Sequence, residues 1–575
     1  MDDSSVAGRR GYRTRNLDAI GQAAAVSRRD IEGKRRKPRL VNPVDAHAPA
    51  LHRPYPRTSP RPARPLIRPG NRSLPTASAG HIPLGRSDRP AYPSSRTHSR
   101  GRHMRYRDVM ATALIMSLAV AGAAGAKQGA VPVHADSNLT ETADAFFKGQ
   151  PTGGVVLVTR GDQVLLRRAY GLSDVENAVP MRPDSALRLA SISKQFTAVA
   201  VLQLVQAGKL GLDSTLASLD PALAGPMAGV TVQQLLTHTS GIKNISGIAA
   251  SRAARREDAD ATRLIGYFKD LPLEFAPGSQ FRYSNSNYIL LTHLIERLDG
   301  RPYPQYMQQA VFQPLGMSHT RYDNHLALIP QRAHGYRRVK GELQNADFIS
   351  MSQPQGAGGL ISTVDDLAIW HRALRDGRLV PAALFAQATG KTTLTNGRLS
   401  PYGFGWIIGQ VGDLPDVEHG GFINGFNSYV VRVKAPDVFV AVLTNAEFTD
   451  PTNLSVRLAA IAAGRPYPAE DTTRKTDTSW TGRYVFADGG ARVVLEKDGA
   501  LQLQQEGDDP VALRPHRDGR HYLDGGLDSL EFGHDAAGRA TVTLHDRLMG
   551  DSIGVRPNES ANAPKNAAAT NSTGP

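Results

Sequence analysis

Two β-rich stretches far apart in a chain of 575 residues limit its possible folds more than any other feature. Residues 153–171 hold two runs of valine and leucine around a turn at 160–162, and residues 428–445 repeat this arrangement around 435–437. Such runs, separated by short polar turns, are typical of β-hairpins. An apolar helix from about Ser191 and a mixed helical region lie between them. Strands at both ends with helices between predict one α+β domain, in which helices and a helical subdomain flank an antiparallel sheet that joins distant segments.

The chain after this domain, which is expected over 127–465, has a different pattern. A polar linker at 466–478 is followed, from Trp480, by short β runs. Three glycine-containing turns separate these runs, at 497–499, 517–519 and 536–538. The pattern predicts a small all-β domain over 479–557, folded as a barrel or sandwich. Residues 558–575 are of low complexity and are expected to form a disordered tail.

The first 107 residues carry the basic character of the chain. The formal charge is +15, but residues 1–107 hold 24 of the 68 lysines and arginines and only 7 of the 53 acidic residues. The remaining 44 basic and 46 acidic residues almost cancel. A basic segment can bind nucleic acid or anionic membranes. Residues 1–103, however, are rich in Arg, Pro and Ser, so we expect a disordered head and no nucleic-acid partner.

An export signal is predicted over 104–126. A short basic start follows Met104, an apolar core begins near Val109, and residues 124–126 (Ala-Gly-Ala) offer a small-x-small cleavage site. These three parts define a secretory signal peptide, so we expect translation from Met104 and a periplasmic or secreted protein. The alternative retains the head, and residues 109–126 then form an uncleaved signal anchor with a basic cytoplasmic arm. A membrane is expected as a partner only in that case.

The absence of cysteine restricts the chemistry. A chain with no cysteine has no thiol nucleophile, no thiolate metal ligand and no disulfide. The sequence also lacks His-Glu-x-x-His, Gly-x-Ser-x-Gly and the glycine-rich phosphate-binding motifs. Zincin, α/β-hydrolase and nucleotide-binding chemistry are therefore disfavoured. We expect neither a metal nor a cofactor.

The sequence Ser191-Ile192-Ser193-Lys194 is a candidate for nucleophilic catalysis. A serine hydroxyl is a poor nucleophile until a base takes its proton, and residues three apart on a helix lie on one face within reach. Free N–H groups at a helix N-terminus stabilise a developing anion. The lysine has only apolar and uncharged neighbours in the sequence. Burial among them would lower its pKa and let it act as a base near neutral pH.

Short motifs of this kind also occur by chance. A second Ser-x-x-Lys, Ser240 to Lys243, lies in a glycine-containing loop where no helix is expected to align the pair. The motif Tyr283-Ser284-Asn285 has its own copy at 322–324. In a site, a phenol can relay or take the serine proton if nearby cations lower its pKa, and the amide can bind the lysine and a substrate carbonyl. On its own, such a motif is more often a turn.

A third candidate, His419-Gly420-Gly421, comes just before Phe422 and the second hairpin. Glycine lets a backbone approach a substrate closely. An edge strand here would add its N–H to that of Ser191 and complete an oxyanion hole, while the histidine would bind or polarise the far end of the substrate. Taken alone, the histidine is more simply explained as structural.

The order of the three motifs is far more specific than any one of them. Ser-x-x-Lys, then Tyr-x-Asn about 90 residues later, then His-x-Gly near the last hairpin resembles the serine β-lactamase / D,D-peptidase superfamily in its class C–like branch. Flanking phrases resemble that branch over 140–463, among them "RLASISKQFTAVAVLQL", "VTVQQLLTHTSGI", "GAGGLISTVDDLAIW" and "YGFGW". The resemblance implies a β-lactamase/transpeptidase-like fold and a serine hydrolase.

The resemblance also implies a role for each site residue. The catalytic residues would be Ser191, Lys194 and Tyr283, and the substrate-binding residues Asn285, His419, Gly421 and Phe422. The serine would form an acyl-enzyme that water then cleaves. The lysine and the tyrosine would share the role of general base, in an order that is left open. The asparagine would orient the lysine, and the N–H groups of the serine and the phenylalanine would form the oxyanion hole.

His419 departs from the most familiar pattern of this superfamily. β-Lactamases and many penicillin-binding proteins have a lysine here, whose fixed charge holds the substrate carboxylate, whereas a histidine is mostly neutral near pH 7. His-x-Gly resembles certain D,D-peptidases, D-aminopeptidases and esterase-like members. We therefore expect small D-amino-acid peptides, amides or esters as substrates. The alternatives are a class C–like β-lactamase and a penicillin-binding sensor with little turnover, with β-lactams as ligands.

The β-rich C-terminal domain resembles the lipocalin-like or barrel appendages of stand-alone serine hydrolases in this branch. Such a domain would either wall the cleft and restrict substrates or serve as a structural addition. Of the two roles, we favour the restriction of access.

Overall fold

The computed structural model describes residues 137–505 and 507–557, and all of them fall within one compact unit of the chain. The predicted head, signal segment and C-terminal tail lie outside the described residues. No helix in the described part of the chain is long and apolar enough to cross a membrane. The domain boundaries assigned from composition stay predictions.

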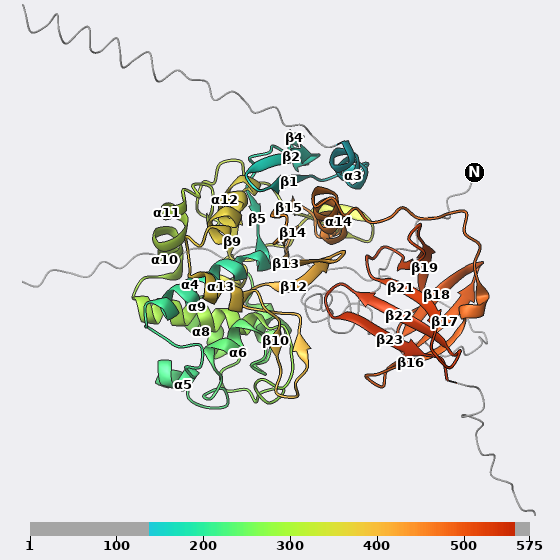
Figure 1. Ribbon diagram of the computed structural model, residues 1–575. Coiled ribbons are helices and arrows are strands. Elements are labelled where there is room, and N and C mark those ends of the chain that lie inside the picture. Colours follow the sequence, from blue (N-terminus) through green and yellow to red (C-terminus); the bar gives the residue numbers. More distant parts are fainter. Residues whose placement is uncertain (1–136, 506, 558–575) are drawn as a thin grey trace, which may run out of the picture. The chain divides into compact units, whose positions relative to one another are not determined.

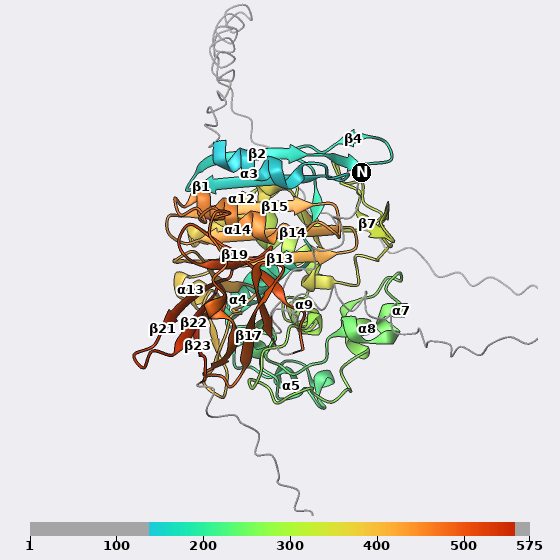
Figure 2. The ribbon, with the colours of Figure 1, turned by 90° about the vertical axis from the view of Figure 1, so that its right-hand side faces the viewer.

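A six-stranded antiparallel sheet forms the centre of the α+β domain (Figure 1). Both predicted hairpins belong to this sheet, and Gly154 pairs with Thr444 across the two hairpins, so the ends of the domain meet. In Figure 2, strands from both hairpins lie one below the other. The strand order is β12 (Ile407–Val411), β13 (Leu414–Ile423), β14 (Phe426–Val433), β15 (Val438–Thr444), β1 (Gly154–Arg160) and β2 (Gln163–Tyr170).

Each face of the sheet packs against its own set of helices. Because side chains alternate along a strand, Val156 and Val158 of β1 face α3 (Ser137–Phe147) and α14 (Thr452–Ala462). Val155 and Leu157 belong instead to the larger core on the opposite face. The main helices contributing to that core are α4 (Ser193–Gln206), α6 (Val232–Leu236), α8 (Ala261–Gly266), α9 (Asn285–Asp299) and α12 (Val364–Arg375).

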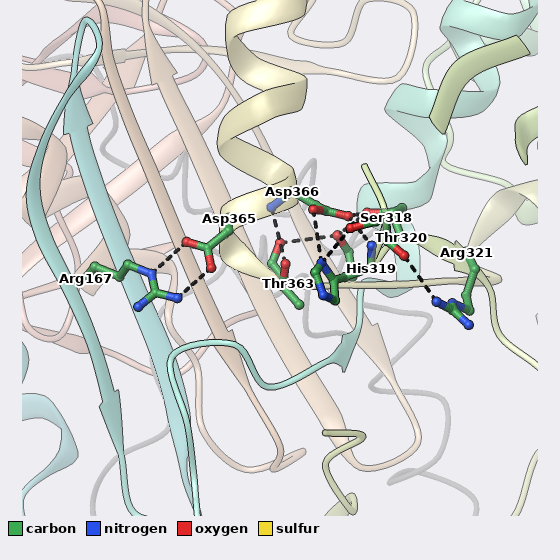
Figure 3. Close-up of polar contacts among 9 residues, drawn as sticks. Arg167, Ser318, His319, Thr320, Arg321, Thr363, Asp365 and Asp366 are labelled. Atoms are coloured by element: carbon green, nitrogen blue, oxygen red, sulfur yellow. Dashed lines mark hydrogen bonds and ion pairs between the residues drawn. The ribbon is translucent and has the colours of Figure 1, made fainter. Parts of the chain in front are cut away.

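A small sheet and the start of α12 fix the segments that surround Ser191. Helix α12 is capped by Thr363, whose side chain accepts from the Asp366 N–H at 3.3 Å. Asp366 is buried and in turn accepts from Thr320 Oγ1 at 2.8 Å and from the His319 N–H at 2.9 Å (Figure 3). These bonds tie α12 to a three-stranded sheet of β5 (Leu187–Arg188), β9 (Leu360–Ser362) and β6 (Arg321–Tyr322). The first of these strands leads directly to Ser191.

The C-terminal domain is a closed antiparallel barrel of eight strands, which confirms the all-β prediction and selects the barrel. The three predicted turns each join consecutive strands, and β16 pairs with β23 to close the ring. Its interior holds large apolar side chains such as Tyr484, Leu503 and Leu530. The strands are β16 (Gly482–Phe486), β17 (Ala491–Lys497), β18 (Ala500–Gln505), β19 (Val511–Pro515), β20 (His521–Leu523), β21 (Ser529–His534), β22 (Ala540–Asp546) and β23 (Gly550–Val555).

Candidate active site

The Ser191 hydroxyl lies at the start of the buried helix α4. Ser191 belongs to a 3₁₀ turn, Ala190–Ile192, that runs directly into α4. Three residues after the serine, Lys194 places its Nζ 3.0 Å from Ser191 Oγ. The structure thus brings the predicted nucleophile and base together through the helical spacing expected from the sequence.

The Lys194 amine is completely buried and has uncharged partners. It donates hydrogen bonds to Asn285 Oδ1 at 2.9 Å and to the backbone oxygen of Ala357 at 2.7 Å. The rings of Tyr283 and Tyr288 have their centroids 4.7 and 5.5 Å from Nζ. Because burial is not compensated by a carboxylate among these partners, it lowers the pKa of Lys194 well below its usual range. A lysine in this environment can act as a base near neutral pH.

Asn285 is the first residue of α9, so the predicted Tyr-x-Asn motif ends where a helix begins. Its side-chain oxygen faces Lys194, while Nδ2 donates to Ser246 Oγ at 3.1 Å. Its backbone N–H donates to Asn244 Oδ1 at 3.2 Å. These contacts fix the direction of the amide, so that only its oxygen is turned toward the lysine. The role of Asn285 in binding substrate stays a prediction.

Tyr283 lies against Lys194, but its phenol is not activated as the sequence pattern required. Its side chain is buried, and burial raises the pKa of the phenol above its usual value, although the nearby Ser191 hydroxyl partly offsets this. The hydroxyl forms no hydrogen bond among the described residues. Lys194 sits over the face of the ring and does not bond to its oxygen. A protonated Tyr283 is thus suited to relay a proton, whereas Lys194 is better suited to be the base.

His419 and Gly421 lie on β13 where this strand passes the Ser191 turn. Strand β12 pairs with β13 only as far as Glu418, so that from His419 onward β13 has an edge that β12 does not cover. A Cβ added to Gly421 would lie 2.0 Å from the backbone oxygen of Leu189. Glycine is therefore required for the strand to approach the turn that carries the serine. Phe422 follows, with its side chain 39% exposed.

The His419 ring is fully buried beside Tyr402. Its Nδ1 lies 2.6 Å from the backbone oxygen of Gly420, and its Nε2 lies 2.8 Å from the Tyr402 hydroxyl. A carbonyl oxygen can only accept, so Nδ1 carries the proton and Nε2 accepts from the tyrosine. Burial, and after it the nearby Lys194, lowers the pKa of His419 to about 3. The ring is therefore neutral throughout the physiological pH range and does not titrate where an ordinary histidine does.

The second copies of the Ser-x-x-Lys and Tyr-x-Asn motifs form hydrogen bonds away from the candidate site. Ser240 Oγ donates to Asn287 Oδ1 at 2.7 Å, and the Lys243 side chain is exposed. The Tyr322 hydroxyl of the second Tyr-x-Asn donates to the backbone oxygen of Met351 at 3.0 Å. The first copy lies in a loop and the second begins on β6, and the hydrogen bonds of Ser240 and Tyr322 go to residues other than Ser191 and Lys194.

Three groups at the site were not predicted from the sequence. The backbone oxygen of Ala357 holds Lys194, and a backbone atom leaves no trace in side-chain patterns. Tyr402 contacts His419, and the centroids of the His238 and Tyr283 rings lie 4.3 Å apart. The last two residues belong to the phrases "YGFGW" and "LLTHTSGI". Their presence in those phrases was the signal that the sequence offered for these two residues, but it did not indicate what either residue does.

One group outside the site has atoms of the kind that bind metals. Asp174, Glu176 and His334 offer ligand atoms within 4.8 Å of one another near the surface. The carboxylates already accept hydrogen bonds, from Asn177 to Asp174 and from Asn345 to Glu176. None of these residues contacts the Ser191–Lys194 pair, and the group does not define a metal centre.

The fold and the site geometry define a β-lactamase/transpeptidase-like protein, with a serine and a lysine at the head of a buried helix beside a sheet edge. A family model named Beta-lactamase matches residues 138–464. The chain belongs to this family of hydrolases, which confirms the resemblance inferred from its motifs.

Individual relatives agree with this placement. The chain is 28% identical over 414 residues to "Penicillin-binding protein 4*" of Bacillus subtilis (strain 168), covering 67% of this chain and 91% of that protein. It is 28% identical over 350 residues to a D-aminopeptidase of Gluconobacter oxydans (strain 621H), covering 60% of this chain and 65% of that protein. The solved structure of the octameric penicillin-binding protein homologue from Pyrococcus abyssi shares the fold, with a TM-score of 0.52, 22% identity, and coverage of 72% of this chain and 99% of that one.

Proposed function

We propose that this chain is an exported serine hydrolase that forms an acyl-enzyme on Ser191 and acts on D-amino-acid peptides, amides or esters. The observation that carries the proposal is the buried amine of Lys194, placed 3.0 Å from Ser191 Oγ and otherwise bonded to uncharged acceptors. This arrangement supplies a base where a serine nucleophile needs one.

The hydrogen bonds of Lys194 define where its lone pair points. Asn285 Oδ1 and the Ala357 oxygen can only accept, so they occupy two N–H groups of the amine. A neutral amine has two N–H groups and one lone pair, and the remaining direction leads to Ser191 Oγ. In the neutral state Lys194 therefore accepts the serine proton as Oγ attacks the substrate carbonyl carbon.

The later steps use groups around the same pair. The N–H groups of Ser191 and Phe422 hold the oxyanion of the tetrahedral intermediate. The proton taken from the serine passes from Lys194 to the leaving amine or alcohol, and the acyl–serine ester remains. The Tyr283 hydroxyl, which has no hydrogen-bond partner among the described residues, relays this proton after it turns toward the Lys194 ammonium. Water then adds to the ester carbonyl and gives a proton to Lys194. The lysine returns this proton to the serine oxygen as the acid product leaves.

Two observations support substrates built on D-amino acids. The Gluconobacter oxydans relative is named a D-aminopeptidase. His419 is neutral and buried, so the position that holds a lysine in β-lactamases supplies no fixed charge for a carboxylate. A site without that charge suits amides, esters and short peptides better than substrates selected by a carboxylate.

We also propose that the enzyme acts in the periplasm or outside the cell. The signal-peptide pattern over 104–126 supports this location, and a chain without cysteine is compatible with it because it needs no oxidative folding. N-terminal sequencing of the protein recovered outside the cytoplasm tests it. A mature N-terminus just after Ala126 supports export with cleavage, and retention of the segment before Met104 contradicts it.

A second candidate function is β-lactam binding with little turnover, and a third is β-lactamase activity. The name of the Bacillus subtilis relative, a penicillin-binding protein, favours the second. The amide of a β-lactam ring would acylate Ser191 by the same route, and the rate at which water cleaves the ester would then separate a sensor from an enzyme.

Three probes distinguish these candidates. Release of nitroaniline from D-alanine p-nitroanilide, but not from its L-enantiomer, supports the D-amino-acid hydrolase. Preferential turnover of nitrocefin supports a β-lactamase. A stable mass increase with benzylpenicillin, without turnover of the other probes, supports a sensor. If a Ser191→Ala chain reacts with all of them as the native chain does, an acyl-enzyme on Ser191 is excluded.

A further inference from the structure

The barrel reaches the central sheet through the turn between β22 and β23. In this turn, Arg547 Nη2 lies 2.9 Å from Glu418 Oε2 and 3.4 Å from Asp416 Oδ2, both on β13. Its Nε donates to the backbone oxygen of Gln410 on β12 at 3.0 Å. The side chains of the two acids have no exposed surface, and that of Arg547 is 12% exposed. Two buried carboxylates of one domain are thus paired with an arginine of the other.

The two carboxylates lie on the part of β13 that leads into the candidate site. Glu418 directly precedes His419, and Asp416 comes two residues earlier. Buried acids on one strand repel each other unless a cation compensates them. Asp416 Oδ1 and Glu418 Oε1 have no hydrogen-bond partner among the described residues. Most of the compensation therefore falls to Arg547.

The next residue of the same turn joins an apolar cluster that includes residues of the candidate site. Leu548 packs in one cluster with Tyr283, Tyr402 and Ile407. The Lys391 ammonium donates to the Leu548 backbone oxygen at 2.7 Å, which fastens the turn to the α+β domain. One turn of the barrel thus belongs to the apolar cluster that holds the proposed proton relay and the residue that bonds to His419.

We propose that Arg547 is a positioning residue for the reaction. It supplies the charge that holds β13, and with it His419 and Gly421, against the Ser191 turn. The inference rests on the proposed function and extends it, because the α+β domain then has an incomplete site without the barrel. The barrel has a role beyond the restriction of access that the sequence suggested.

Arg547→Met in the full chain tests the proposal, because it removes the charge and keeps much of the side-chain length. A displaced β13 should lower kcat on D-alanine p-nitroanilide by roughly 100-fold, with a smaller change in KM, since positioning matters most in the transition state. Arg539→Met is the matched control. Arg539 lies just before the other end of β22 and forms a partly exposed ion pair with Asp535 of the same domain, so its loss should change kcat by less than about twofold.

Rescue separates charge compensation from simple packing. Combining Arg547→Met with Asp416→Asn and Glu418→Gln removes the charges that need a cation. If Arg547 acts by compensation, this triple variant recovers most of the lost kcat. If the triple variant stays as slow as Arg547→Met while its circular dichroism matches the native chain, the proposal is wrong.

The pH dependence gives a second readout. Protonation of Asp416 removes its charge as the amide substitution does, so the activity of Arg547→Met relative to the native chain should rise as the pH falls. Burial and the adjacent Glu418 already raise the pKa of Asp416 well above its usual range. The other titratable groups facing this cluster are Tyr429, Tyr467, Asp528 and Asp546.

One of these groups requires its own control. Burial and the charge of Asp546 raise the pKa of Asp528 to about 6, and Asp528 accepts a hydrogen bond from the Arg547 N–H at 3.0 Å. The pH comparison is therefore repeated in an Asp528→Asn background. A relative activity that does not change with pH in either background contradicts the proposal.

Hydrogen–deuterium exchange tests the same inference without a substrate. Peptides covering Leu414–Ile423 should exchange faster in Arg547→Met than in the native chain or in Arg539→Met, because the strand loses its anchor. Equal exchange in all three chains overturns the proposal. Failure of the proposed function would appear instead in the native chain, as no turnover of the D-substrate, and would leave this result unaffected.

Discussion

The two Ser-x-x-Lys sequences of this chain have the same spacing and different surroundings. Ser191 and Lys194 lie at the head of a buried helix, with Nζ 3.0 Å from Oγ. Ser240 lies in a loop and donates to Asn287, and the Lys243 side chain faces solvent. The difference shows that four residues do not make a site. Burial of the lysine among uncharged acceptors lowers its pKa, as the proposed base requires, and the helix fixes the direction in which its amine points.

The largest expected effect is the loss of the Ser191 hydroxyl. Ser191→Ala should lower kcat on the D-substrate by at least about 10,000-fold, because no other group forms the acyl-enzyme. Ser240→Ala should leave kcat within about threefold and destabilise the fold by about 1–3 kcal/mol, because it leaves the Asn287 oxygen and the Ile242 N–H without their partner. Steady-state kinetics and urea unfolding of both variants provide the comparison. Equal losses of kcat would mean that the two sequences are not distinct in function.

The next effect concerns the two lysines. Lys194→Met preserves side-chain length but removes the base, so kcat should fall by about 1,000-fold. Lys243→Met changes an exposed side chain and should leave kcat within about twofold. A pH–rate profile of the native chain should show an ascending limb at a pH well below the usual lysine range, since burial lowers the pKa of Lys194. Full activity of Lys194→Met would assign the base to another group.

The Tyr-x-Asn motifs extend the comparison with a smaller effect. Tyr283→Phe should lower kcat by about 100-fold and leave KM almost unchanged, because only the relay of the proton is lost. The buried ring remains to pack against Lys194. Tyr322→Phe removes a hydrogen bond to the Met351 backbone and should affect stability by about 1 kcal/mol without affecting kcat. A Tyr283→Phe chain with native kcat would remove the tyrosine from the proton path.

The parts of the site that could be predicted are those encoded locally. Ser191 and Lys194 are three residues apart where a helix begins, and Val155 lies in a β-rich run that ends at a polar turn. The three motifs could be combined into one candidate site because of their order along the chain. The contact of the Ala357 oxygen could not be predicted, because it is a backbone atom and lies 163 residues from Lys194 in the sequence. The ion pairs of Arg547 could not be predicted either, because its two acidic partners lie on a strand 129 and 131 residues away in the sequence.

The pKa values were harder still, because they depend on burial that no local pattern reports. From the sequence, Tyr283 could act as a base only if nearby cations lowered its pKa, and His419 was expected to be mostly neutral near pH 7. The structure places Tyr283 where burial raises the pKa of its phenol. It places His419 where burial lowers the pKa of the ring to about 3. Both shifts have the same physical cause, which is the cost of placing charge in the interior.

The smallest expected effect concerns the stability of the fold in acid, which tests the burial of the His419 ring. The pKa of His419 is about 3 in the folded chain, below the value of about 6.5 for an unfolded histidine. The unfolded state therefore takes up the proton first, and the contribution of the neutral ring to stability is present above pH 6.5 and is lost as the pH falls below it. Between pH 7 and pH 5 this loss amounts to about 2 kcal/mol.

His419→Gln removes this titration and keeps an amide that can bond to Tyr402. Its free energy of unfolding in urea should therefore fall by about 2 kcal/mol less than that of the native chain between pH 7 and pH 5. The buried His238, whose pKa burial also lowers, is present in both chains and cancels in the difference. His334→Gln, at an exposed histidine, is the matched control and should follow the native chain. If His419→Gln also followed it, the His419 ring would be accessible to protons, and the neutral surroundings that distinguish the Ser191 site from the Ser240 loop would not extend to β13.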